Sequence, residues 1–225
     1  MSNSLCIISG YLIGSINPAY IFSRIKGYDI RKKGTGNAGA TNLALQSGIG
    51  CGIAALLLDM LKAFLATYLP LKTGKTAFVA AASGIASIAG HIFPFYMGFR
   101  GGKGTACVVG FGLALQPKLC VPLVLISMLI AKLVGASTLV PVFAAAIMAL
   151  CYAIFERSLW MTLLMLLLTV ILLIPRRQDI LRLRNSKSQK GQAKDQSLWV
   201  SPLKLKEEYT RRSQKPVVQR EKEEN

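Results

Sequence analysis

The sequence predicts an all-α integral membrane protein with about seven transmembrane helices joined by glycine-rich cytoplasmic loops. Of its 225 residues, 52% are hydrophobic, and the mean hydropathy is +0.46, which is high for a soluble domain of this length. The apolar residues are gathered in runs on the scale of a bilayer crossing. The net charge of +17 comes from the segments between and after those runs, as is typical of the cytoplasmic loops of membrane proteins.

The chain contains seven apolar segments that we expect to be helices in the membrane. The first is interrupted at Asn17-Pro18, and the fourth is short enough to be re-entrant rather than spanning. An external N-terminus places most of the basic connecting segments and the C-terminus in the cytoplasm, which predicts a multi-pass protein of the cell (plasma) membrane with a cytoplasm-facing site. The segments are Leu5–Ile25, Gly48–Leu69, Ala77–Met97, Val108–Leu115, Val121–Val134, Leu139–Phe155 and Leu159–Ile174, and the cytoplasmic loops are 26–42, 98–105 and 132–138.

Composition divides the chain into a membrane domain, residues 1–185, and a basic tail, residues 186–225. The tail is polar and poor in aromatic residues, a composition that predicts disorder on an anionic lipid surface. The apolar body argues against nucleic acid as the partner of the positive charge. Five cysteines lie within apolar runs and none forms a C-x-x-C pair, so we expect buried, reduced thiols and no metal site.

The stretch 90–105 is the strongest candidate for a ligand-binding loop. It contains the only histidine, His91, and ends in Gly101-Gly102-Lys103-Gly104. Glycines allow backbone N–H groups to approach an anion closely, and the lysine adds positive charge, so the pattern favours a phosphate ligand. An ordinary interfacial turn with basic residues remains the alternative.

Another glycine-rich loop lies earlier in the chain, in residues 34–42. Gly34-Thr35-Gly36-Asn37-Ala38-Gly39 matches G-x-G-x-x-G, but a dinucleotide fold requires a preceding buried strand within a βαβ unit. Here charged residues precede the motif and an apolar segment follows it, which excludes that fold. The loop still offers backbone amides and polar side chains for an anion, namely those of Thr35, Asn37, Thr41 and Asn42.

Asp59, Lys62 and His91 are ionisable residues inside apolar segments, away from the segment ends. Asp59 and Lys62 are one helical turn apart, and charges within a membrane usually pair. We therefore favour an ion pair between them over the alternative that either side chain faces a polar cavity near the site. His91, with an ordinary pKa of about 6.5, is a candidate general base, although a hydrogen bond to a neighbouring helix explains it equally.

The order of these motifs resembles the bacterial membrane family of acyl-phosphate:glycerol-3-phosphate acyltransferases. The resemblance covers most of residues 5–183 and rests on Gly14–Pro18, Asp29–Arg31, the 34–42 loop, Asp59-x-x-Lys62 and the 90–105 stretch. It implies transfer of a fatty acyl group from acyl phosphate to glycerol 3-phosphate, giving lysophosphatidic acid for phospholipid synthesis in contact with membrane lipid, without cofactor or metal. It also places Arg31, Thr35, Asn37, Lys103 and the glycines of 101–104 at matching positions.

Several positions depart from the family pattern. Thr35 replaces serine and Leu45 replaces arginine; Gly135-Ala136-Ser137-Thr138 retains two hydroxyls of a serine-rich motif. Arg176-Arg177-Gln178-Asp179 replaces His-Arg-Glu-Asn, where either arginine offers a forked phosphate contact. These departures leave open a catalytically weak relative that binds acyl or phosphate ligands as a sensor or regulator, and, less favoured, an anion transporter.

The candidate site therefore combines the residues argued from chemistry with those implied by resemblance. The catalytic candidates are Thr35, His91 and Lys103. The substrate-binding candidates are Arg31, Gly34, Gly36, Asn37, Thr41, Asn42, Gly101, Gly102, Gly104, Ser137, Thr138, Arg176 and Arg177.

Overall fold

The computed structural model describes residues 2–134, 137–177 and 179–181. Residues 1–178 form one compact unit, and the regular elements described within it are all helical, as predicted. The proposed tail, 186–225, lies outside the described residues. The elements are α1 (Asn3–Ser15), α2 (Pro18–Ile25), η1 (Ile30–Lys32), α3 (Ala40–Ser47), α4 (Ile49–Lys72), α5 (Ala77–Ile92), η2 (Phe95–Met97), α6 (Thr105–Leu115), α7 (Pro117–Val134), η3 (Ser137–Leu139), α8 (Val140–Ile154), α9 (Leu159–Leu173) and η4 (Ile174–Arg176).

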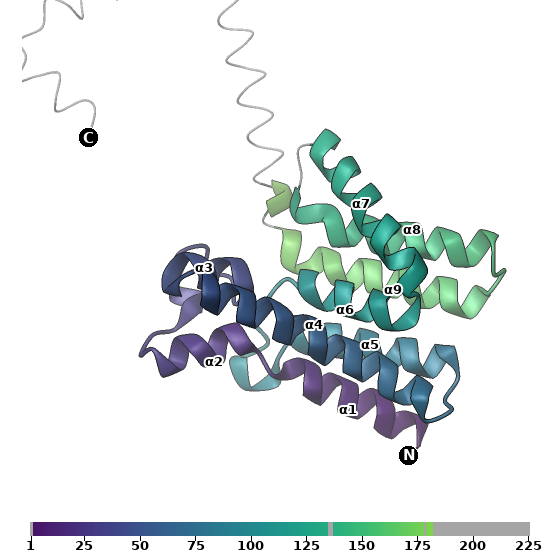
Figure 1. Cartoon of the computed structure of the whole chain (residues 1–225), viewed down its shortest axis with the longest axis horizontal. Coiled ribbons are helices and arrows are strands. Elements are labelled where there is room, and N and C mark those ends of the chain that lie inside the picture. The colour runs from purple at the N-terminus through teal and green to yellow at the C-terminus, as the bar shows by residue number, and fades with distance from the viewer. Residues whose placement is uncertain (1, 135–136, 178, 182–225) are drawn as a thin grey trace, which may run out of the picture. The chain divides into compact units, whose positions relative to one another are not determined.

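The N-terminal helices pack through small residues. α1 lies along α5, and α4 contacts both of them and α6 (Figure 1). Gly10 and Gly14 of α1 lie directly against Ser83 and Ser87 of α5, where a Cβ on either glycine would overlap the serine backbone. Helices in lipid associate through close backbone contact of this kind, because apolar side chains gain little by leaving lipid for protein.

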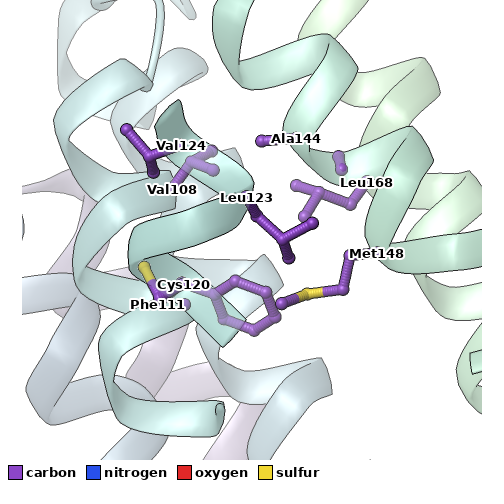
Figure 2. A pocket seen from close by; sticks show the side chains of 10 residues that line it. Val108, Phe111, Cys120, Leu123, Val124, Ala144, Met148 and Leu168 are labelled. Carbon is purple, nitrogen blue, oxygen red and sulfur yellow. The ribbon is translucent and has the colours of Figure 1, made fainter. Parts of the chain in front are cut away.

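The C-terminal helices form an apolar core with α6. α8 packs on α9, α7 packs on α8, and α6 contacts α7 (Figure 1). Figure 2 shows the small pocket between them, where Phe111 and Met148 converge from opposite sides and Leu123 and Leu168 complete the wall. Its lining carries no charged side chain, so the chemistry that the polar motifs suggest lies elsewhere.

The outward faces of the helices are strongly apolar, as a bilayer requires. In the described part of the chain, four segments are long and apolar enough to cross a membrane, and two more apolar helices are shorter. Large side chains such as Leu57, Leu125 and Trp160 are exposed on these faces. The four segments are Asn3–Ile25, Ile49–Lys72, Ala77–Met97 and Leu159–Arg176, and the shorter helices are Thr105–Leu115 and Val140–Ile154.

Some predicted boundaries were wrong. The helix α3 lies partly within the loop predicted for 26–42, and Gly48, with a φ of +93°, separates it from α4. α4 continues through Pro70 to Lys72 rather than ending at the proline. The predicted break at Asn17 is confirmed: its Oδ1 accepts a 2.9 Å hydrogen bond from the Tyr20 amide and caps α2, as an N-cap asparagine does.

Candidate active site

The glycine-rich loop of residues 34–42, named the first loop, is organised by Asn42, which is fully buried. Its Oδ1 accepts a 3.0 Å hydrogen bond from the Thr35 amide. Its Nδ2 lies 3.0 Å from each of three acceptors, the carbonyls of Ile30, Lys33 and Asn37. Because Oδ1 and Nδ2 of Asn42 both form hydrogen bonds within the loop, this side chain stabilises the loop. Its contact with substrate stays a prediction.

Glycines allow this loop to turn tightly and to present its tip to solvent. Gly34 and Gly36 have φ angles of +56° and +72°, the left-handed region that glycine adopts without steric cost. Thr35 and Thr41 are exposed. The Thr35 hydroxyl accepts a long 3.4 Å contact from the Asn37 amide, and its exposure leaves it accessible to a ligand.

Arg31 connects the first loop to the segment before the second. Its Nε and Nη2 donate to the Asp29 carboxylate at 3.0 and 2.8 Å, and its Nη1 donates to the Met97 carbonyl at 2.7 Å. The guanidinium also lies over the Tyr20 ring, 5.0 Å from the centroid. The hydrogen bond from Arg31 lowers the pKa of Asp29 to about 2, and that same bond raises the pKa of Arg31. This geometry links the two loops.

In the second loop, residues 98–105, two of the amides predicted to bind an anion form hydrogen bonds within the protein. The Gly101 amide donates to the Ile92 carbonyl at 2.9 Å, and the Gly102 amide donates to the His91 carbonyl at 3.1 Å. The expectation that these two amides face a phosphate was therefore wrong, because they complete the hydrogen bonding at the end of α5. The second loop also supplies the cationic side chain of Lys103 and, after Gly104 (φ +74°), the N-terminus of α6, a feature that suits an anion.

The two loops meet at Gly102, which is buried. A Cβ there would overlap the His91 ring at Nε2 and the carbonyl of Ala38. That same carbonyl accepts a 3.1 Å hydrogen bond from Asn17 Nδ2, while the Tyr96 hydroxyl accepts from the Asn17 amide at 3.1 Å. Asn17 and Tyr96 were not predicted as site residues, although Asn17 lies at the predicted helix break within Gly14–Pro18 and Tyr96 lies within the 90–105 stretch.

The C-terminal candidates reach the second loop through Arg176, which is fully buried. Its Nε donates to the Thr138 carbonyl at 2.7 Å, its Nη1 to the Leu172 carbonyl at 2.7 Å, and its Nη2 to the Thr105 hydroxyl at 3.0 Å. Arg177 is exposed, and the side chain of Ser137 lies outside the described residues. The Arg176 side chain thus connects α9, η3 and the first residue of α6.

Beneath the loops lies a buried cluster that we name the Asp59–Lys62–His91 cluster. Lys62 Nζ is 2.8 Å from Asp59 Oδ1 and 2.9 Å from His91 Nδ1. His91 Nδ1 is in turn 3.1 Å from Asp59 Oδ1. The predicted ion pair is confirmed. The ligand atoms of Asp59, His91 and Cys107 lie within 4.8 Å of one another, an arrangement seen in metal sites, but the Lys62 ammonium contacts both the carboxylate and the imidazole and opposes a second cation there.

The fold and the gathered loops define a helical integral membrane protein with a basic, glycine-rich site at one end of its helices. The chain belongs to the glycerol-3-phosphate acyltransferase family, whose model matches residues 4–186.

Individual proteins of this family are similar in sequence to the chain. The chain is 46% identical over 116 residues to a glycerol-3-phosphate acyltransferase of Halalkalibacterium halodurans, a match spanning 50% of this chain and 56% of that one. It is 35% identical over 185 residues to the enzyme of Geobacter sulfurreducens, covering 82% and 95% of the two chains.

Solved structures share the fold as well. The chain superposes with a TM-score of 0.74 and 28% identity on the integral membrane acyltransferase PlsY (YgiH) in its glycerol 3-phosphate form, covering 83% of this chain and 94% of that one. The lysophosphatidic acid form of PlsY gives a TM-score of 0.71 and 27% identity, with coverages of 83% and 93%.

Proposed function

We propose that this protein transfers a fatty acyl group from acyl phosphate to a hydroxyl of glycerol 3-phosphate, producing lysophosphatidic acid and inorganic phosphate. The observation that carries the proposal is the meeting of the two glycine loops at Gly102, with Lys103 beside the contact. Two substrates that each carry a phosphate need two anion-binding loops side by side. Membership of the glycerol-3-phosphate acyltransferase family supports the same substrates.

The reaction needs little covalent chemistry from the protein. Acyl phosphate is a mixed anhydride, so its carbonyl carbon is already activated. The glycerol hydroxyl oxygen forms the ester bond to that carbon, the bond from the carbon to the phosphate oxygen breaks, and the hydroxyl proton passes to an oxygen of the departing phosphate. The protein must hold two anions together, orient the hydroxyl and offset the charge developing on the carbonyl oxygen.

The described side chains suggest how these tasks are divided. Lys103 and the N-terminus of α6 bind a substrate phosphate, and the exposed Thr35 hydroxyl of the first loop donates a hydrogen bond to the other substrate. His91 is 3% exposed and its Nδ1 faces Asp59 and Lys62, so we assign the proton to the phosphate rather than to this imidazole. No cofactor is required by this chemistry.

The proposed location is the cell membrane, with the site facing the cytoplasm. The basic segments 26–42 and 98–105 meet where Gly102 lies against the Ala38 carbonyl, and positive loops favour the cytoplasmic side. Acyl phosphate reaches such a site from the lipid with its chain in the membrane, while glycerol 3-phosphate arrives from water.

The test is an acyl-transfer assay on purified protein in detergent or lipid. Radiolabelled glycerol 3-phosphate is supplied with palmitoyl phosphate, palmitoyl-CoA or palmitoyl acyl carrier protein in parallel. Labelled lysophosphatidic acid is expected with palmitoyl phosphate and not with the thioesters. Saturable binding of palmitoyl phosphate without product would instead favour the sensor function, and uptake of glycerol 3-phosphate into vesicles without product would favour transport.

A further inference from the structure

The Asp59–Lys62–His91 cluster contacts the second loop directly, at Gly102, and reaches the first loop through Ile16 and Asn17. We infer that the cluster fixes the two loops relative to each other, so that Asp59 and Lys62 are positioning residues for acyl transfer. The inference rests on the proposed function and deepens it. Its argument follows two chains of contacts that leave the cluster in different directions.

One chain of contacts runs through His91 to the second loop. On its Nδ1 edge the ring faces Asp59 Oδ1 at 3.1 Å and Lys62 Nζ at 2.9 Å; Nδ1 donates to the carboxylate when it is protonated and accepts from the ammonium when it is not. Its Nε2 edge faces Gly102 so closely that a Cβ on this glycine would overlap it, and the His91 carbonyl accepts the Gly102 amide at 3.1 Å. The orientation of one imidazole therefore supports the backbone that leads into Lys103.

The other chain runs through Lys62 to the first loop. Lys62 Nζ donates to the Ile16 carbonyl at 2.5 Å, at the break between α1 and α2, where helix hydrogen bonding is interrupted. The next residue, Asn17, donates from Nδ2 to the Ala38 carbonyl of the first loop at 3.1 Å. One ammonium group thus reaches the first loop through two hydrogen bonds while contacting the residue that supports the second.

The energetics favour positioning over simple stabilisation. Asp59, Lys62 and His91 are 2%, 7% and 3% exposed, and burying charges in a low-dielectric interior costs about as much as their attraction returns, so apolar replacements of whole buried pairs are often neutral or stabilising. Alignment of two bound reactants, by contrast, is sensitive to small displacements: a shift of about 1 Å can lower a rate by about 100-fold. A cluster that adds little net stability but joins both loops is suited to that task.

The test replaces both charges together, because a single change would leave one charge buried without its partner. In Asp59→Leu/Lys62→Met, we expect a melting temperature close to that of the parent and a kcat at least about tenfold lower. The KM for each substrate should change by less than about threefold, because each loop stays intact and only their mutual alignment is lost. The matched control is Ser87→Ala, one turn before His91 on α5; among the described residues Ser87 Oγ has no hydrogen-bond partner, and parental kcat is expected.

A folded double variant with parental kcat overturns the inference, as does one in which only KM rises. If the apolar pair does not fold, Asp59→Asn/Lys62→Met carries the same test; if neither folds, the cluster serves folding and the inference is wrong.

Hydrogen exchange of the Gly101 and Gly102 amides provides a second measurement, which does not depend on catalytic activity. We expect these amides to exchange faster in the double variant than in the parent. If the parent protein shows no acyl transfer but these two amides exchange faster in the double variant, the proposed function is wrong and the inference that the cluster fixes the loops stands. If their exchange rates are the same in both proteins, that inference is wrong.

Discussion

The guanidinium of Arg176 donates a 3.0 Å hydrogen bond to the hydroxyl of Thr105, 71 positions earlier in the chain. Its other two nitrogens donate to the carbonyls of Thr138 and Leu172, each at 2.7 Å. Every guanidinium nitrogen therefore has an acceptor within the protein. This buried residue holds the end of α9 against the start of α6, immediately after the glycine turn.

Arg176→Ala is expected to destabilise the protein by about 3 kcal/mol, because the buried Leu172 carbonyl, the partly buried Thr138 carbonyl and one hydroxyl lose a charged donor. Thermal unfolding of the purified variant measures the effect. The control is Arg177→Ala, since its side chain is exposed and surface changes usually fall within about 0.5 kcal/mol. Parental stability with a raised KM for glycerol 3-phosphate would instead show that Arg176 binds phosphate.

Lys103→Ala tests the cation of the second loop. If Lys103 meets a substrate phosphate, the loss of transition-state stabilisation should be about 2–4 kcal/mol in kcat/KM. Lys103→Arg should recover little, because a planar fork does not replace a compact ammonium beside close-packed glycines. Steady-state kinetics with palmitoyl phosphate measure both variants. The control is Lys72→Ala at the far end of α4, and near-normal turnover of a folded Lys103→Ala protein would remove the phosphate assignment.

Gly102→Ala tests the contact between the loops. The added methyl would overlap the His91 ring and the Ala38 carbonyl, so the loops must separate, and we expect kcat to fall by about 100-fold. Gly50→Ala is the control: nothing lies near its Cβ position, and alanine is the better helix former there. Normal activity of Gly102→Ala would show that the two loops can move apart without consequence.

Sequence patterns located the helices and both loops, because apolar runs and glycine clusters are local signals. The amides of Gly101 and Gly102 were misassigned because the carbonyls at the end of α5 compete for them, and that competition depends on how the chain folds back. The role of Asn17 was also beyond the sequence, since its partner Tyr96 lies 79 positions away. Likewise, the sequence predicted a phosphate contact for Arg176, and only tertiary contacts show that this residue is fully buried.

Asp29 predicts a pH dependence of stability. Its pKa is lowered from 3.8 to about 2 in the folded protein, chiefly by the hydrogen bond from Arg31. A carboxyl whose folded pKa lies below its unfolded value stabilises the fold above the unfolded pKa, and this contribution is lost as the pH falls through the folded pKa. The difference in melting temperature between the parent and Asp29→Asn should therefore be constant from neutral pH to about 5 and then shrink toward pH 2. A difference that persists unchanged at pH 2 contradicts the assignment.

The orientation of the protein is tested by labelling from outside intact cells. In a variant whose five native cysteines are replaced by alanine, single cysteines are introduced as Lys72→Cys and Lys33→Cys, both at exposed positions. Lys33 directly precedes the first glycine loop. Lys72 lies at the C-terminal end of α4, a helix long enough to cross the membrane. Because the positive charge of the 26–42 segment favours the cytoplasm, a membrane-impermeant maleimide should label Cys at 72 and not at 33.

Permeabilising the cells supplies the control, since both cysteines should then react. Each variant must also retain acyl-transfer activity or parental thermal stability, so that the labelling reports on a folded protein. Labelling at 33 but not at 72 in intact cells reverses the topology and places the site outside. In that orientation glycerol 3-phosphate made in the cytoplasm could not reach the loops without crossing the membrane, and the proposed reaction would lose its source of acceptor.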